Sequence, residues 1–175
     1  MKLEVSVVLP FPRERVYATY RDKLPELSRY LPNVRSIQQV ERHDAGHVAK
    51  MLNRWRGGGE VPAVARSFLS EDLLQWDDHA TWDHSAWTCH WRTEVSAFKD
   101  AVRAEGLNTF EVVEPSSTRL TIRGDIEVDA TKVRGVPRLL AGGVGAAIEK
   151  FLVATIRPNL VSVAEGLGKY LSENP

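Results

Sequence analysis

The sequence has only one cysteine, no net charge and no long hydrophobic run, and each absence excludes a class of protein. A single cysteine cannot form an internal disulfide, which is typical of a reducing compartment. The 23 basic residues are balanced by 23 acidic ones, whereas nucleic acids and anionic membrane surfaces attract concentrated positive charge. No segment approaches the ~20 apolar residues of a membrane-spanning helix. We therefore expect a cytoplasmic protein with no nucleic-acid partner and no stable membrane insertion.

The 175 residues are the size of one domain, and we expect 1–175 to form a single one. Residues 2–9 alternate between apolar and polar types, which predicts a half-buried strand. Two short helices should follow, one beginning near Pro12 and one within 24–32. The region from about 137 to 171 has one long helical pattern. Six further strands are predicted between these helices, at about 34–43, 46–55, 72–82, 86–97, 101–114 and 117–129.

Short turns between successive strands favour an antiparallel sheet, and a single long helix must cover one face of it. The expected class is α+β: a curved, seven-stranded antiparallel sheet wrapped around a long C-terminal helix, with two short helices after the first strand. Segment 56–70 has no clear pattern, and its three consecutive glycines favour a loop at the rim of the sheet.

This order of elements resembles the START-like, birch-pollen-allergen-like superfamily, also called SRPBCC, which has the helix-grip fold. The segment "LPELSRYLPNVRSI" is similar to the part of polyketide-cyclase-like and coenzyme Q-binding members that leads into the second strand. "SSTRLTIRGDIEV" resembles their last strand, and "GGVGAAIEKFLVATIRPNLVSVAEGL" resembles their C-terminal helix. The resemblance implies one START-like domain that holds a hydrophobic ligand between sheet and helix; a minority of members are enzymes.

All five tryptophans are expected on the inner face of the sheet, because side chains alternate across a strand and the indoles share the parity of the apolar residues. Several of their neighbours are glycine or alanine, so we expect unfilled space that a ligand occupies. Tryptophan supplies flat apolar walls and one N–H donor. The predicted ligand-contacting residues of the sheet are Trp55, Trp76, Trp82, Trp87, Trp91, Asn108, Phe110 and Ile122.

The long helical pattern has an apolar stripe whose first half is nearly bare of large side chains. Three residues of that half, and the leucine that follows it on the stripe, are predicted to face the ligand: Gly142, Gly145, Glu149 and Leu152. Glu149 is a carboxylate on the buried stripe, and burial raises the pKa of a carboxyl. It is therefore the candidate general acid or base, although no second acid, base or nucleophile is identified on the inner face.

The histidines and the cysteine lack the arrangement of a metal site. Zinc requires three or four converging ligands, whereas Cys89 and His90 are neighbours on a predicted strand and point apart. His79 and His90 are predicted on the outer face. We expect no metal and no cofactor.

The leading hypothesis is a protein that binds or carries a hydrophobic small molecule, such as a lipid, an isoprenoid or a polyketide-like compound, in a cavity between the sheet and the C-terminal helix. The first alternative is an enzyme similar to polyketide cyclases and aromatases that uses Glu149 as acid or base; we expect a binding protein rather than an enzyme. The second alternative is an interaction module whose cavity has closed. The sequence leaves open the ligand, the pathway and the oligomeric state, a homodimer included.

Overall fold

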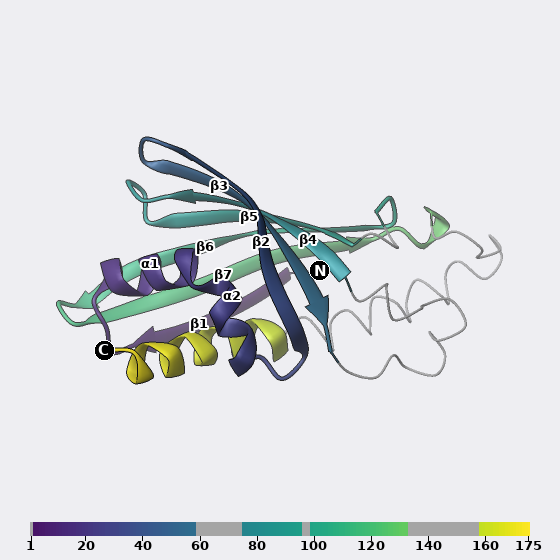
Figure 1. Ribbon diagram of the computed structural model, residues 1–175. Coiled ribbons are helices and arrows are strands. Elements are labelled where there is room, and N and C mark those ends of the chain that lie inside the picture. The colour runs from purple at the N-terminus through teal and green to yellow at the C-terminus, as the bar shows by residue number, and fades with distance from the viewer. Residues whose placement is uncertain (1, 59–74, 96–98, 133–157) are drawn as a thin grey trace.

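The computed structural model describes residues 2–58, 75–95, 99–132 and 158–175, which contain a curved antiparallel sheet with helices on its inner side (Figure 1). Neighbouring strands are antiparallel throughout, in the order β1-β7-β6-β5-β4-β3-β2. The predicted seven-stranded α+β architecture is confirmed. The strands are β1 Lys2–Leu9, β2 Val34–Ala45, β3 Val48–Gly57, β4 Gln75–Asp83, β5 Thr88–Val95, β6 Val102–Glu114 and β7 Ser117–Val128.

The two short helices after β1 lie where the sequence predicts them, and the described part of the C-terminal helix falls within the predicted region. After β1 come α1 Arg13–Asp22, α2 Leu24–Leu27 and the 3-10 turn η1 Ser28–Tyr30, while η4 Ala130–Lys132 follows β7. Residues 158–173 are helical, and the earlier part of the predicted C-terminal helix lies outside the described residues. In the part of the chain that the structure describes, no helix is long and apolar enough to cross a membrane.

The turn between β4 and β5 corrects one predicted strand boundary. The Asp83 carboxylate accepts hydrogen bonds from the backbone N–H groups of Ser85 (2.9 Å) and Ala86 (3.2 Å), which fixes the turn. Trp87 has a φ of 54° and therefore belongs to this turn. The strand predicted at 86–97 begins at Thr88 instead, because a left-handed backbone is incompatible with a pleated strand.

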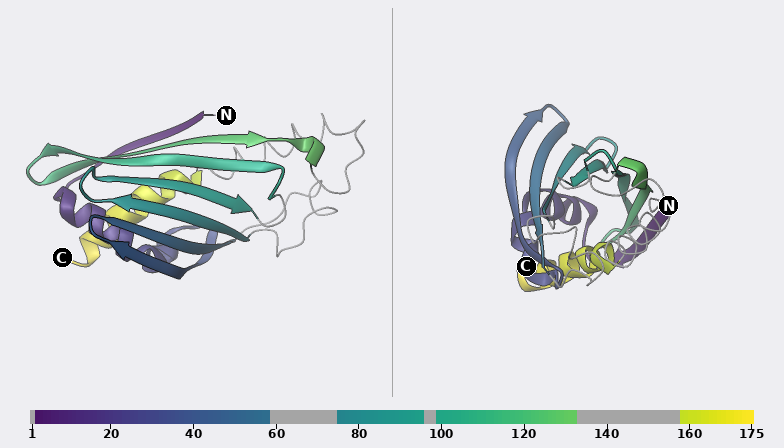
Figure 2. Two further views of the ribbon diagram at one scale, coloured as in Figure 1. Left: turned by 90° about the horizontal axis from the view of Figure 1, so that it is seen from above. Right: turned by 90° about the vertical axis from the view of Figure 1, so that its right-hand side faces the viewer.

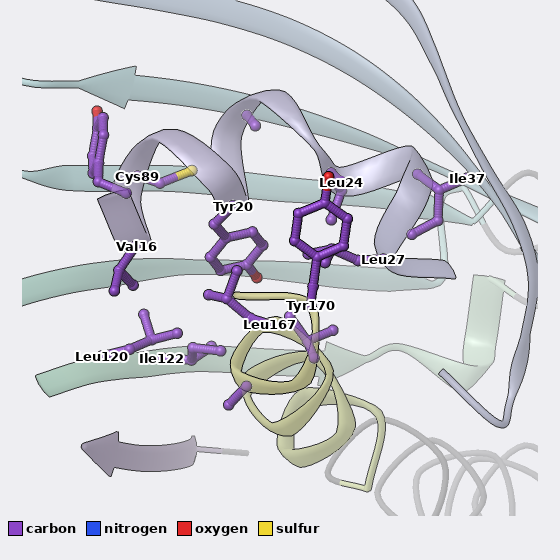
Figure 3. Packing of buried hydrophobic residues seen from close by; sticks show 14 of the residues in the cluster. Val16, Tyr20, Leu24, Leu27, Ile37, Cys89, Leu120, Ile122, Leu167 and Tyr170 are labelled. Carbon is purple, nitrogen blue, oxygen red and sulfur yellow. The ribbon is translucent and has the colours of Figure 1, made fainter. Parts of the chain in front are cut away.

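The C-terminal helix lies across the open side of the curved sheet (Figure 2). Leu167 and Tyr170 point from this helix toward the side chains of α1 and α2 (Figure 3). The Arg15 guanidinium of α1 donates hydrogen bonds to the carbonyl oxygens of Leu171 (2.9 Å) and Asn174 (2.6 Å). These bonds connect α1 to the end of the C-terminal helix.

Two glycines of the sheet make room for a tryptophan ring. Gly106 of β6 pairs with Gly124 of β7, and Gly106 also pairs with Trp91 of β5. A Cβ atom at Gly106 would lie 2.2 Å from the Trp91 ring and 2.1 Å from the carbonyl oxygen of Arg123. At Gly124 the nearest Trp91 ring atom would be 2.8 Å away. These glycines were expected to leave space for a ligand, but the indole of Trp91 occupies that space.

Candidate functional site

A row of polar side chains crosses the inner face of the sheet. Asn53 of β3 pairs with Asp78 of β4, and Asp78 pairs with Thr93 of β5. Asn53 is buried, while Asp78 and Thr93 are half-buried. Because alternate residues of a strand share a face, Asp78 lies on the same side as the neighbouring inner residues Trp76 and Ala80. We call Asn53, Asp78 and Thr93 the polar row.

The carboxyl group of Asp78 is the chemically unusual member of the polar row. Burial raises its pKa from 3.8 to about 6, although the Asn53 amide and the Trp55 indole favour the charged form. The Asn53 amide donates a hydrogen bond of 3.2 Å to the carboxylate. No basic side chain of the described ranges forms an ion pair with Asp78 or lowers its pKa. A carboxyl in this state exists in both protonation forms near neutral pH.

The adjacent carboxylate has the opposite environment. Asp77 lies on the outer face, where the Arg54 guanidinium donates two hydrogen bonds of 2.8 and 2.9 Å to it. This pairing lowers the pKa of Asp77. The contrast between two neighbouring aspartates follows from the alternation of the strand: one faces water and an arginine, and the other faces the interior.

Tryptophan rings stand on both sides of the polar row. Trp55 and Trp76 are register partners that lie two residues along their strands from Asn53 and Asp78, and their rings stack with centroids 5.7 Å apart. The indole N–H of Trp55 is buried and makes no hydrogen bond of normal geometry in the described ranges. On the other side of the row, Trp91 pairs with Ala80 and donates its N–H to the Asn108 side-chain oxygen at 3.0 Å.

Three of the predicted ligand contacts pack against α1 instead of facing open space. Tyr17 makes edge contacts with Trp82 (5.2 Å between centroids), Trp87 (5.2 Å) and Phe110 (5.0 Å). The Arg13 guanidinium lies 4.1 Å from the centre of the Trp87 ring. Trp82 and Phe110 are almost completely buried. Protein atoms therefore already occupy the inner sides of these three rings.

Of the remaining predicted residues, two lie in the core and four lie outside the described residues. Asn108 is buried and bonded to Trp91, and Ile122 is buried in the core near α1. Gly142, Gly145, Glu149 and Leu152 lie outside the described residues.

Of the polar row, Asp78 was not identified from the sequence, and the expectation that the inner face has no second acid is corrected by this residue. The signal was available, because Asp77 and Asp78 are adjacent on one strand and cannot both face solvent. Asp78 also shares the parity of Trp76, Ala80 and Trp82, which were expected to face inward.

Cys89 and the histidines form no reactive centre in the described ranges. Cys89 is buried, and burial raises the pKa of its thiol well above the usual range, so the thiolate is disfavoured. His79 and His90 lie on the outer face, where they border an open depression of about 850 Å³. No group of three or more histidine, cysteine or acidic side chains in these ranges could hold a metal ion.

Comparison with known proteins gives a likeness in structure without one in sequence. No protein-family model and no curated protein matches the chain. A protein from Thermus thermophilus is 22% identical over 100% of both chains, with a TM-score of 0.68. The Zhui aromatase/cyclase from a Streptomyces species is 14% identical over 98% of this chain and 95% of its own, with a TM-score of 0.66.

Norcoclaurine synthase from Thalictrum flavum, solved in complex with dopamine and hydroxybenzaldehyde, is 12% identical over 100% of this chain and 88% of its own, with a TM-score of 0.61. These identities are too low to transfer an activity, since one fold supports many functions. The similarity of the structures, together with the sheet order and the placement of the helices, shows that the chain has the START-like, SRPBCC helix-grip fold.

Proposed function

We propose that this protein binds a hydrophobic small molecule against the inner face of β3, β4 and β5, beneath the C-terminal helix. The observation that carries the proposal is the arrangement of that face: the stacked Trp55–Trp76 pair and the Trp91 ring flank a half-buried polar row. Flat apolar walls around a few polar groups are typical of small-molecule sites. The predicted helix residues Gly142, Gly145, Glu149 and Leu152 complete the site in this proposal.

Binding would be driven by the apolar surface that the ligand removes from water, at about 25 cal/mol per Å² before the costs of association. Trp82, Trp87 and Phe110 belong to the α1 core in this proposal, because Tyr17 covers them. Trp76 is the tryptophan of the site that best reports binding, since it is half-buried and stacks on Trp55 at the edge of the core.

The test uses Nile red, an uncharged dye whose emission shifts in apolar surroundings. Saturable binding to the wild-type protein is expected, and Trp76→Ala should weaken it about five- to tenfold through the lost ring contact. Trp87→Phe is the matched control, because Trp87 packs on Arg13 and Tyr17 at the turn. The absence of saturable binding, or equal losses in both variants, would overturn the proposal.

A second candidate function is proton-transfer catalysis, and the pKa of Asp78 favours it. A carboxyl with a pKa of about 6 can both donate and accept a proton near neutrality, as general acid–base catalysis requires. The Streptomyces structure described above, an aromatase/cyclase, supports this candidate at the level of the fold. Asp78 would take the acid–base role, and Glu149 of the predicted helix would be its partner across the site.

This candidate is tested with 2-tetralone, an apolar ketone whose protons next to the carbonyl exchange with deuterated water. The wild-type protein should accelerate the exchange, measured by NMR, by about 100-fold or more. Asp78→Asn should return the rate to background while Nile red binding persists, and Asp77→Asn should keep the wild-type rate. An unchanged exchange rate in Asp78→Asn would exclude the role of Asp78.

A further inference from the structure

The polar row also limits the chemistry of the ligand that the proposed site accepts. We infer that the ligand carries a hydroxyl group on its apolar body, and that this hydroxyl bridges the Asp78 carboxylate and the Trp55 indole N–H. The inference rests on the proposed function, because it concerns the polar end of the molecule bound there. Neither an alcohol nor a phenol is favoured by the polar row itself, since both present the same O–H group.

The Asp78 carboxylate can accept more hydrogen bonds than it receives. A carboxylate has about four acceptor positions; in the described ranges the Asn53 amide donates a hydrogen bond to this carboxylate, and the Trp55 indole N–H acts on it as a weaker donor. The row partner Thr93 makes no side-chain hydrogen bond in the same ranges. A half-buried carboxylate with spare lone pairs favours a ligand that donates a proton in a hydrogen bond.

A second polar group of the site is the indole N–H of Trp55. It is buried and makes no hydrogen bond of normal geometry in the described part of the chain, but it acts on Asp78 as a weak hydrogen-bond donor that favours the charged carboxylate. A buried donor without a hydrogen bond of normal geometry requires an acceptor atom. A hydroxyl oxygen satisfies this requirement while its own hydrogen is donated to Asp78. An ammonium group could donate to the carboxylate, but it has no lone pair for the indole.

The negative charge of the Asp78 carboxylate also selects among ligands. A ligand carboxylate would lie beside the Asp78 carboxylate, and no described cation pairs with that group. Two like charges in a partly buried site repel one another. Fatty acids and other anionic lipids are therefore disfavoured relative to neutral hydroxylated molecules of similar apolar surface.

The experiment compares three probes that share a naphthalene ring: 2-naphthol, 2-methylnaphthalene and 2-naphthoate. Their affinities are measured at pH 7.5 by displacement of Nile red. For the wild-type protein, 2-naphthol should bind about tenfold or more tightly than 2-methylnaphthalene, as a hydrogen bond to a charged group implies. The carboxylate of 2-naphthoate should make it the weakest of the three.

Two variants separate the contributing groups. Asp78→Asn should reduce the preference for 2-naphthol over 2-methylnaphthalene to about threefold or less and should improve 2-naphthoate binding, because the charge is gone. Trp55→Phe should reduce the same preference while it retains the apolar ring. Asp77→Asn, on the outer face, is the control and should keep the wild-type ratios.

The outcomes distinguish this inference from the proposed function. Binding of Nile red with equal affinities for 2-naphthol and 2-methylnaphthalene in the wild-type protein would overturn the hydroxyl inference alone, and this comparison requires no variant to fold. Retention of the hydroxyl preference in Asp78→Asn would overturn the role assigned to Asp78. If neither Nile red nor any naphthalene probe binds, the proposed function and the inference both fail.

Discussion

Replacing Asp78 by asparagine should stabilise the folded protein at neutral pH and change its stability much less in acid. Burial raises the pKa of this carboxyl from 3.8 to about 6, so the folded state holds the proton more tightly than the unfolded chain. Between these two values the folded state binds more protons, and the free energy of unfolding therefore falls as the pH rises. One pKa unit corresponds to about 1.4 kcal/mol. Above pH 6 the free energy of unfolding of the wild-type protein is therefore lowered by at most about 3 kcal/mol.

The assay is urea unfolding followed by tryptophan fluorescence at several pH values from 4 to 8. Asparagine has nearly the shape of aspartate but no charge, so it avoids the cost of a buried carboxylate. The difference in unfolding free energy between variant and wild type should be about 0.5 kcal/mol at pH 4 and about 2–3 kcal/mol at pH 7.5. Tyr20 and Cys89 sense the charge of Asp78, but burial raises the pKa of both, and they stay neutral over this range.

Asp77→Asn is the matched control with the opposite sign. Arg54 lowers the pKa of Asp77, so this pair stabilises the folded state at neutral pH, and its contribution is lost as the pH falls through the lowered pKa. The variant should lose less than about 1 kcal/mol at pH 7.5, because the pair is partly exposed to solvent. A gain in Asp78→Asn that is equal at pH 4 and pH 7.5, or a shift of both variants in the same direction at pH 7.5, would refute the reasoning.

Three further predictions concern packing, reactivity and the contact between the chain ends. Gly124→Ala should lower the free energy of unfolding in urea by about 2–4 kcal/mol through overpacking, because its methyl would lie 2.8 Å from the Trp91 ring. The loss should be smaller in a Trp91→Phe background, and equal losses in both backgrounds would contradict the contact. The buried Cys89 thiol should react with iodoacetamide only as fast as the protein opens, so rapid labelling of the folded protein at pH 8.5 would show that the thiol is accessible. Arg15→Ala should cost about 1–3 kcal/mol, because two carbonyl oxygens lose their donor; Arg15→Lys should recover part of this, and a thermal midpoint unchanged in both variants would contradict it.

The fold was predictable because its signals are local. Apolar alternation in β1, the helix that begins after Pro12 and the two-residue turn at Gly46, whose φ is 61°, each specify structure within a few residues. The same alternation identified the inner face correctly for Trp55, Trp76 and Trp82. It could also have identified Asp78, which shares the parity of Trp76, but the sequence-based prediction left this residue unassigned.

What covers the inner face was not predictable from alternation. Parity shows that Trp82 and Phe110 face inward, but only the tertiary structure places Tyr17 and Tyr20 of α1 against them. The same limit applies to Gly106 and Gly124, whose missing side chains suggest a void until the Trp91 ring is placed. The face on which a side chain lies is set by its own strand. Whether the space in front of that side chain is filled depends on segments that are distant in sequence.

The position of β1 has a consequence for how the chain folds. From β2 to β7 each strand pairs with its neighbour in sequence, so these pairings join nearby parts of the chain, but β1 pairs with β7, where Val5 meets Ile122. Closing so long a loop costs chain entropy before any contact compensates it, and such non-local pairings slow folding. Until β1 docks, β7 has an unpaired edge on which another chain could add a strand. We therefore expect the docking of β1 to be the late, concentration-sensitive step of refolding, at which correct closure competes with association between chains.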